Sequence, residues 1–210
     1  MRASPLIRIG ITGTIGSGKS TVGKILEELG VPVIDTDKLV HQILDGNSKV
    51  QSQIAERFGK DVLITNGGGT AKIDRKALGA KVFQDSQARK DLEAIIHPNV
   101  RIECRKLIDQ FSHDETLKAV ATLVPLLFEA NIQKDYDEVW TVTSDEKSIY
   151  SRLAARDRLT AEEITQRLKA QLGQEKKSEL ADRVIDNSKD LEYTRQQVKE
   201  HLNASLNGVV

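Results

Sequence analysis

Residues 13–21 of this 210-residue chain read Gly-Thr-Ile-Gly-Ser-Gly-Lys-Ser-Thr, which fits the phosphate-binding pattern G-x-x-x-x-G-K-[ST]. The apolar run 6–12 before this loop predicts a buried strand. Residues 19–29 after it predict a helix, because their apolar side chains recur on one helical face. A strand, a glycine loop and a helix in this order form the context in which the motif binds phosphate.

The residue types of the loop indicate its chemistry. Glycines let the backbone fold tightly around a phosphate, while the loop N–H groups and the positive end of the following helix attract an anion. We expect Lys19 to reach the β- and γ-phosphates of a nucleotide and the Ser20 hydroxyl to coordinate Mg²⁺. The alternative is a glycine turn that caps a helix, with Lys19 solvated. The expected nucleotide contacts are Gly13, Thr14, Ile15, Gly16, Ser17, Gly18, Lys19, Ser20 and Thr21.

Composition limits the other functions. The formal net charge is +0 and the isoelectric point is about 6.9, so no overall field attracts nucleic acid or a membrane surface. The longest apolar runs, such as 120–128, are too short to cross a bilayer, and we expect no signal peptide. Cys104 is the single cysteine, which excludes an internal disulfide and disfavours a zinc site. We therefore expect a cytoplasmic monomer or weak homo-oligomer without nucleic-acid or membrane partners.

Strand-like runs alternate with helical runs along the chain, which favours an α/β fold with a parallel five-stranded sheet flanked by helices. The run 118–125 is the most apolar, and we place it at the centre of the sheet. The predicted strands are 6–12, 31–35, 118–125, 138–143 and 183–186.

The stretch 36–116 contains no convincing strand and reads as a helical insertion between two strands of the sheet. A loop rich in glycine, residues 66–70, interrupts it. A second helical stretch, 145–180, is rich in charge. The helices predicted in the insertion are 36–44, 47–58, 74–83 and 86–111, and the last helix of the chain is 190–204.

Two carboxylates, Asp35 and Asp37, follow the second predicted strand. Ligands of open α/β sheets bind at the carboxyl ends of the strands, so we expect these side chains to face a phosphate held by the loop. Either carboxylate can take a proton from an acceptor hydroxyl or hold Mg²⁺ through water. The alternative is that one of them caps the next helix.

Arg152 and Arg156 are four residues apart in a predicted helix, so they share a face. Two guanidinium groups together suit a polyphosphate whose charge grows during transfer. The alternative is a solvated basic face paired with Asp145, Glu146 or Asp157.

Other polar residues lie at chain positions suited to a site. Arg75 at a helix start and His97 beside Pro98 are candidates for an acceptor pocket, although a histidine next to proline also serves as a structural cap. Glu129 follows the third predicted strand, where a second carboxylate near a metal is expected. Asn187 follows the last strand and is placed to contact a base edge.

Taken in order, these residues resemble the pattern of the dephospho-CoA kinase family over nearly the whole chain. The aspartate pair, the His-Pro dipeptide and the Pro-Leu-Leu-Phe-Glu run make the resemblance far more specific than the glycine loop alone. The chain departs from the family pattern at Thr14, where the family has glycine, and at Ser188, where a glycine usually follows the Asp-Asn pair. The matching segments are 11–21, 33–37, 74–78, 95–98, 124–129 and 181–187.

The resemblance implies ATP-dependent phosphorylation of the 3′-hydroxyl of the dephospho-CoA ribose, which is the last step of coenzyme A synthesis. It implies a P-loop kinase fold with a helical acceptor-binding insertion and a helical lid. The nucleotide-binding core would comprise residues 1–36, 117–144 and 181–210, the dephospho-CoA-binding domain residues 37–116 and the lid residues 145–180.

The resemblance also implies roles for single residues. Asp37 is the base, and Lys19, Arg152 and Arg156 act on the transferred phosphate. Asn187 contacts the adenine. The residues implied for the acceptor site are Asp37, Arg75, His97, Pro98, Leu126 and Glu129.

Three other functions are compatible with a glycine loop of this kind. The first is a kinase of another small acceptor, such as a nucleoside monophosphate, shikimate or gluconate. The second is a nucleotide-dependent switch, which the absence of an Asn-Lys-x-Asp guanine signature weakens. The third is a nucleic-acid-processing ATPase, against which the balanced charge counts.

Overall fold

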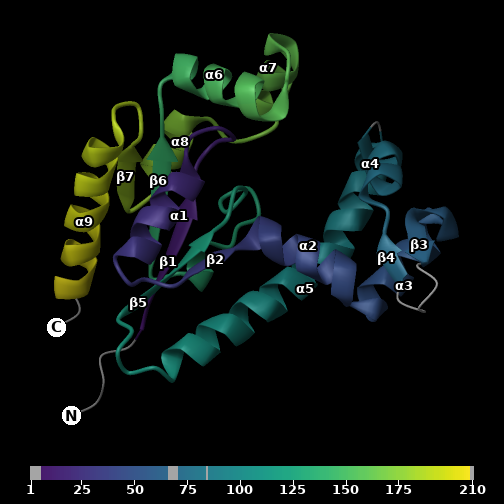
Figure 1. The fold of residues 1–210 in the computed structure, drawn as a ribbon, viewed down its shortest axis with the longest axis horizontal. Coiled ribbons are helices and arrows are strands. Elements are labelled where there is room, and N and C mark those ends of the chain that lie inside the picture. The colour runs from purple at the N-terminus through teal and green to yellow at the C-terminus, as the bar shows by residue number, and fades with distance from the viewer. Residues whose placement is uncertain (1–5, 66–70, 84, 209–210) are drawn as a thin grey trace. The chain divides into compact units, whose positions relative to one another are not determined.

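The computed structural model of the chain describes residues 6–65, 71–83 and 85–208 (Figure 1). The chain divides into two compact units, the first formed by residues 1–35 and 108–210 and the second by residues 36–107. The predicted glycine loop 66–70 lies outside the described residues. No helix among the described residues is long and apolar enough to span a membrane.

The first unit is built on a five-stranded parallel sheet with the strand order β2-β5-β1-β6-β7. This confirms the predicted α/β fold class, and each strand falls at a position predicted from the sequence. The prediction that the run 118–125 is central was wrong, because β5 lies between β2 and β1 and the strand that enters the glycine loop is the middle one. The strands are β1 (Ile7–Thr12), β2 (Val33–Asp35), β5 (Ala119–Leu123), β6 (Glu138–Thr143) and β7 (Arg183–Asp186).

Two apolar clusters lie on opposite faces of the sheet, and the isoleucines of β1 belong to the larger one. Ile9 and Ile11 are fully buried in the larger cluster, which also contains Trp140. Gly10 faces the other side, where a Cβ atom would lie 2.7 Å from the Leu127 side chain. Isoleucines therefore alternate along this strand with Arg8, Gly10 and Thr12, and the isoleucines fill the larger cluster.

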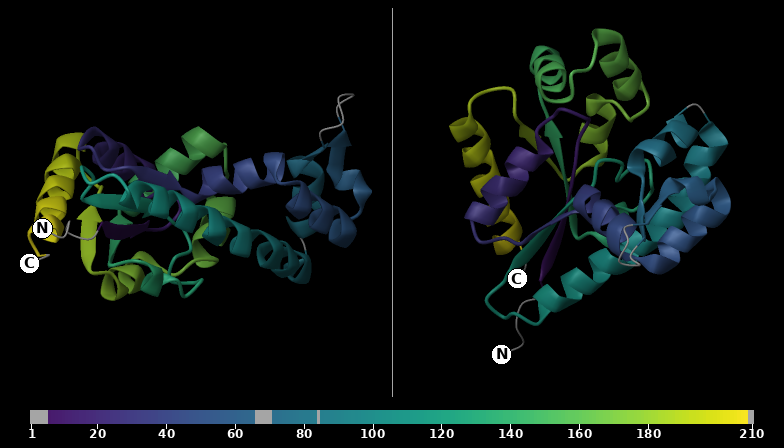
Figure 2. Two further views of the ribbon diagram at one scale, coloured as in Figure 1. Left: turned by 90° about the horizontal axis from the view of Figure 1, so that it is seen from below. Right: turned by 45° about the vertical axis from the view of Figure 1, so that its right-hand side comes forward.

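Helices cover the sheet of the first unit. Figures 1 and 2 show α9 beside α1, and apolar residues of both helices join the larger cluster. A short 3₁₀ helix, Gln133–Asp135, precedes β6. The α-helices of this unit are α1 (Lys19–Glu28), α6 (Glu146–Asp157), α7 (Ala161–Lys169), α8 (Gln174–Leu180) and α9 (Leu191–Asn207).

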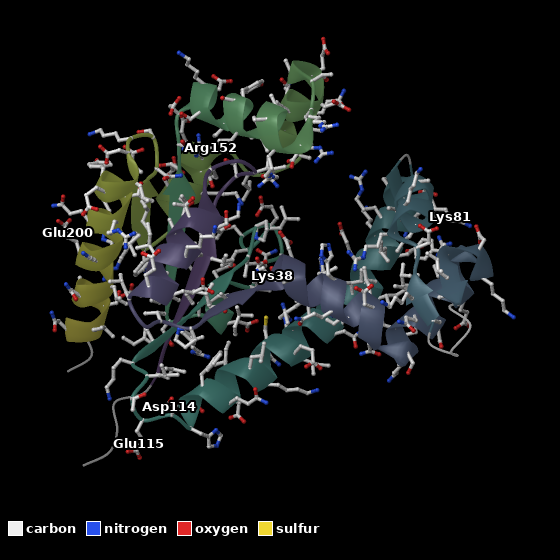
Figure 3. The ribbon with its side chains drawn as sticks, viewed as in Figure 1. Lys38, Lys81, Asp114, Glu115, Arg152 and Glu200 are labelled. Atoms are coloured by element: carbon white, nitrogen blue, oxygen red, sulfur yellow. The ribbon has the colours of Figure 1, made fainter. Side chains whose placement is uncertain are left out.

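The second unit is mainly helical but also contains a two-stranded antiparallel sheet of β3 (Leu63–Thr65) and β4 (Ala71–Ile73). The prediction of no strand in this stretch was wrong, because strands of three residues are too short to show an alternating pattern. Lys81 of α4 (Figure 3) connects this helix to the segment after α3 by donating hydrogen bonds to the Phe58 carbonyl and to Asp61. Its helices are α2 (Thr36–Gly46), α3 (Ser48–Phe58), the 3₁₀ helix Lys60–Val62, α4 (Arg75–Phe83) and most of α5 (Ser86–Ser112).

Helix α5 continues through Pro98, in agreement with the predicted helix 86–111, and His97 therefore does not cap a helix end. Proline removes one backbone donor and crowds the preceding turn. The Asn99 side-chain amide donates to the Ile95 carbonyl of the preceding turn at 2.8 Å. Both His97 and Pro98 are exposed.

Glu138 at the start of β6 is expected to stabilise the fold in a pH-dependent manner. Burial alone would raise the pKa of this carboxylate, but hydrogen bonds from Arg183, Ser205 and Trp140 outweigh burial and lower the pKa from 4.5 to about 2. Because the pKa is lowered in the folded state, the stabilisation is present above pH 4.5 and is lost as the pH falls towards 2.

Glu138→Gln should therefore lower the free energy of unfolding by about 1–2 kcal/mol at pH 7, because solvent screens part of the interaction of this partly exposed carboxylate. Urea titrations followed by circular dichroism at several pH values would measure the difference from the unaltered protein. The difference should shrink between pH 4.5 and about 2. A difference that stays constant with pH would contradict this explanation.

Candidate active site

The glycine loop between β1 and α1 adopts a backbone conformation that only glycine permits at two critical positions. Gly13 has φ +149°, and a Cβ atom there would lie 2.4 Å from the Val142 carbonyl oxygen. Gly18 has φ +102°, and its Cβ atom would lie 1.9 Å from Nδ2 of Asn187. Gly18 is also the N-cap of α1, so no side chain occupies the first-turn amides. The loop thus meets the requirements of an anion site at a helix N-terminus.

Lys19 folds back over the loop, where its ammonium group donates to the carbonyls of Gly13 at 2.9 Å and Thr14 at 3.0 Å. The Thr14 side chain is buried, with 2% exposed. The contact of Thr14 with Lys19 is made by its backbone carbonyl, which glycine would also supply at this position.

Ser20 lies in the first turn of α1 with its side chain exposed. A hydroxyl oxygen is a hard ligand, and Mg²⁺ in kinases is held by one or two protein oxygens together with substrate phosphates. Among the described residues, no group of three or more histidine, cysteine, aspartate or glutamate side chains is arranged to hold a metal ion. The exposed Ser20 hydroxyl is an oxygen donor of the kind that fits Mg²⁺.

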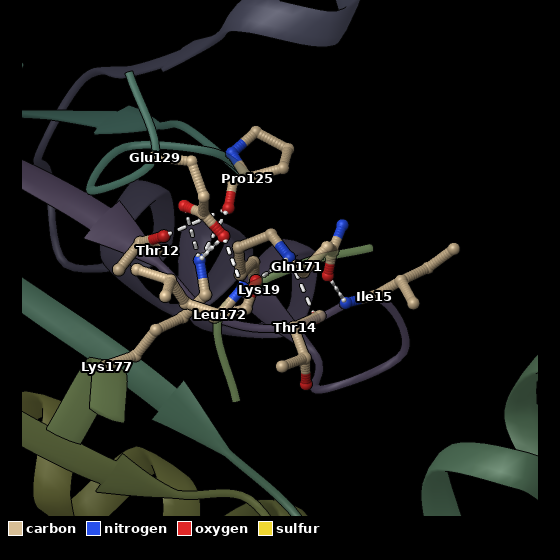
Figure 4. Close-up of polar contacts among 10 residues, drawn as sticks. Thr12, Thr14, Ile15, Lys19, Pro125, Glu129, Gln171, Leu172 and Lys177 are labelled. Atoms are coloured by element: carbon tan, nitrogen blue, oxygen red, sulfur yellow. Dashed lines mark hydrogen bonds and ion pairs between the residues drawn. The ribbon is translucent and has the colours of Figure 1, made fainter. Parts of the chain in front are cut away.

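The segment between α7 and α8 is fastened to the glycine loop. The Gln171 side-chain oxygen accepts a hydrogen bond from the Ile15 amide at 2.9 Å (Figure 4). The Ile15 side chain packs against a small apolar cluster of α6 and α7, which includes Leu153 and Ile164. Both the backbone and the side chain of this loop residue are therefore held by the segment predicted as a lid.

Glu129 is paired with Lys177, which is fully buried (Figure 4). The Lys177 ammonium group lies 2.9 Å from the Glu129 carboxylate and donates to the Pro125 carbonyl at 3.1 Å. The Leu172 amide donates to the same carboxylate at 2.9 Å. This ion pair joins the loop after β5 to α8. It could not be predicted from the sequence, because Lys177 lies among other charged residues and no local pattern distinguishes it from them.

Arg152 of α6 is bound to the outer side of the glycine loop (Figure 3). Its Nη1 atom lies 3.2 Å from the Gly16 carbonyl oxygen and 3.3 Å from the Ser17 carbonyl oxygen. Its Nη2 atom donates to the Asn187 carbonyl at 3.0 Å. In this structure the guanidinium group therefore supports the loop backbone.

Three further predicted site residues of the first unit, Arg156, Leu126 and Asn187, differ in their exposure to solvent. Arg156 forms two hydrogen bonds with Asp157, which raise the pKa of the arginine, and 64% of its side chain is exposed. Leu126 is 37% exposed, whereas the next two residues of its run are buried in the smaller cluster. Asn187 is 5% exposed and donates to the Ser17 carbonyl at 2.8 Å.

The second unit contains the remaining predicted residues. Asp37 is exposed in the first turn of α2. The positive end of the helix dipole stabilises a carboxylate at this position. Arg75 begins α4 and pairs with Asp45 at 2.5 Å. A pocket of about 450 Å³ lies between α2 and α5, lined by Leu39, Gln42, Ile43, Gly46, Asn47, Ser48, Glu103 and Leu107.

Comparison with known proteins gives a consistent result. The sequence model of the dephospho-CoA kinase family matches residues 7–192. A dephospho-CoA kinase of Symbiobacterium thermophilum is 42% identical over 200 residues, which cover 95% of this chain and 82% of that protein. A solved protein of Thermus thermophilus, TT1252, superposes with a TM-score of 0.79 at 34% identity, covering 96% of this chain and 98% of that one.

The solved dephospho-CoA kinase of Campylobacter jejuni superposes with a TM-score of 0.71 at 30% identity, covering 97% of this chain and 98% of that one. These likenesses cover at least 95% of this chain and between 82% and 98% of the matched proteins. The chain belongs to the dephospho-CoA kinase family.

Proposed function

We propose that this chain uses ATP and Mg²⁺ to phosphorylate the 3′-hydroxyl of the dephospho-CoA ribose. The observation that carries the proposal is the glycine loop, whose positive-φ glycines and uncapped helix start fit phosphate, within a chain that belongs to this kinase family. Shikimate, gluconate and nucleoside monophosphates become weaker candidates, because the family match spans residues 7–192.

In this proposal Lys19 releases the Gly13 and Thr14 carbonyls and binds the transferred phosphate, while Ser20 holds the metal ion. Mg²⁺ supplies charge neutralisation for the phosphate oxygens when it is bound. Most of the rate enhancement then comes from positioning and charge stabilisation.

Asp37 acts as the base that orients and deprotonates the ribose hydroxyl. Chain connectivity supports this role, because Asp37 follows the last residue of β2 by two positions. Two residues span at most about 7 Å, so the backbone of Asp37 stays near the carboxyl edge of the sheet.

The remaining assignments concern the acceptor site and the lid. We assign residues 37–116 to dephospho-CoA binding, with Arg75 and His97 as contacts. We assign α6 and α7 to a lid that brings Arg156 to the phosphates and excludes water. A cytoplasmic location and a monomeric or weakly associated state stay predictions.

The test is ATP consumption by the purified protein with Mg²⁺, measured with and without dephospho-CoA, while mass spectrometry follows the acceptor. We expect a large acceptor-dependent rate and the addition of one phosphate to the ribose. Shikimate, gluconate and a nucleoside monophosphate are the control acceptors. ATP binding without stimulation by dephospho-CoA would reject the proposed acceptor.

A further inference from the structure

Thr194, on the C-terminal helix α9, is fully buried, with 0% of its surface exposed. Its hydroxyl lies 3.0 Å from the Oδ1 atom of Asn187 and 3.3 Å from the Asp190 carbonyl oxygen. The residue also lies outside the segment 7–192 that matches the family.

Asn187 uses every polar group it has on neighbouring residues. Its backbone amide donates to the Thr143 carbonyl at 2.8 Å, and its backbone carbonyl accepts from Arg152 and from the Ser144 hydroxyl. Its side-chain Nδ2 donates to the Ser17 carbonyl at 2.8 Å. The side-chain oxygen is the remaining acceptor, and the Thr194 hydroxyl is its donor.

This chain of hydrogen bonds fixes one peptide group of the loop. The Ser17 carbonyl and the Gly18 amide belong to the same planar trans peptide unit, so they point in opposite directions. Because Asn187 donates to the Ser17 carbonyl at 2.8 Å and Arg152 at 3.3 Å, the Gly18 amide points away from these two side chains. Gly18 is the N-cap of α1, where loop amides bind phosphate.

We propose that Thr194 is a positioning residue for nucleotide binding, which orients the Asn187 carboxamide and through it the Gly18 amide of the phosphate-binding loop. The hydroxyl favours the rotamer in which Nδ2 faces Ser17, because it supplies a donor to the opposite end of the amide. Without that donor, the buried Oδ1 atom has no partner and the amide is free to leave the loop.

The inference rests on the nucleotide-binding part of the proposed function but not on the identity of the acceptor. Equilibrium binding of ATP, measured by calorimetry without acceptor, is therefore the main readout. Thr194→Val, which has the same shape but no hydroxyl, should weaken ATP binding about tenfold. Thr194→Ser, which keeps the hydroxyl, should bind ATP within about threefold of the unaltered protein.

Ser205→Ala is the matched control, because Ser205 is a buried hydroxyl of the same helix that donates to Glu138 and not to Asn187. This variant should lose stability but keep its ATP affinity. In ¹H–¹⁵N spectra of the folded proteins, the Gly18 amide signal should move in Thr194→Val and stay in place in Ser205→Ala. Thr194→Ala is the second variant if the valine protein does not fold.

The outcomes separate the possibilities. The inference would be overturned if the unaltered protein binds ATP and a folded Thr194→Val variant binds it equally well. The proposed function would then remain intact. Equal losses of affinity in Thr194→Val and Ser205→Ala would also overturn the inference, because they would indicate a general effect of stability. Failure of the unaltered protein to bind ATP would overturn both the inference and the proposed function.

Discussion

Asp37→Asn is expected to lower kcat by a factor of about 10² to 10⁴ while the affinity for ATP changes by less than about threefold. Asparagine keeps the size of the side chain and one acceptor oxygen, but it cannot take up a proton at neutral pH. The loss should therefore fall on the chemical step, where the ribose hydroxyl gives up its proton. Steady-state kinetics with dephospho-CoA and direct ATP binding would measure the two quantities separately.

Two matched variants sharpen this test. Asp35→Asn alters the other carboxylate of the pair, at the end of β2, and decides which of the two acts as the base. Asp61→Asn removes an exposed carboxylate that pairs with Lys81, and it should leave kcat within about twofold. Near-normal turnover of Asp37→Asn would remove Asp37 from the role of base. A large loss in Asp35→Asn alone would transfer that role to Asp35.

The sequence was sufficient to predict the elements that local pattern determines. The glycine loop, the five strands of the sheet and the start of α2 after β2 follow from motif spacing and apolar periodicity within short windows. The order of the strands could not be predicted in the same way. The most apolar run became β5 and not the central strand, because strand order depends on crossover connections and not on the composition of one strand.

The contacts that support the loop could not be predicted, because they join residues far apart in the chain. Gln171 and Ile15 are 156 positions apart, and Arg152 and Gly16 are 136 positions apart. A glutamine or an arginine on a polar helix gives no local signal of such a partner. The arginine pair illustrates this, since Arg152 contacts the loop while Arg156 pairs with its neighbour Asp157.

Lys177→Met is expected to lower the free energy of unfolding by about 3–5 kcal/mol, the usual cost of removing one partner of a buried ion pair. Lys177 is 0% exposed and Glu129 only 21%, so the variant leaves a carboxylate with little access to water. Lys176→Met is the control, because Lys176 pairs with Glu179 in solvent and should contribute less than about 1 kcal/mol. Urea titrations followed by the fluorescence of Trp140, the single tryptophan, report on this unit.

The double variant Lys177→Met with Glu129→Gln should recover part of the loss, because no unpaired charge remains buried. Equal stability of Lys177→Met and Lys176→Met would contradict the importance of the buried pair.

Two roles are possible for Glu129, support of the glycine loop and contact with the acceptor. Through the Leu172 amide Glu129 holds the segment that carries Gln171, and Gln171 in turn holds the Ile15 amide of the loop. Glu129→Gln should therefore weaken ATP binding more than it raises the KM for dephospho-CoA, although the family resemblance implies an acceptor contact. The structure supports the role in holding the loop, because the Glu129 carboxylate oxygens already accept hydrogen bonds from Lys177 and from the Leu172 amide. A rise in the acceptor KM that exceeds the loss of ATP affinity would instead place Glu129 in the acceptor site.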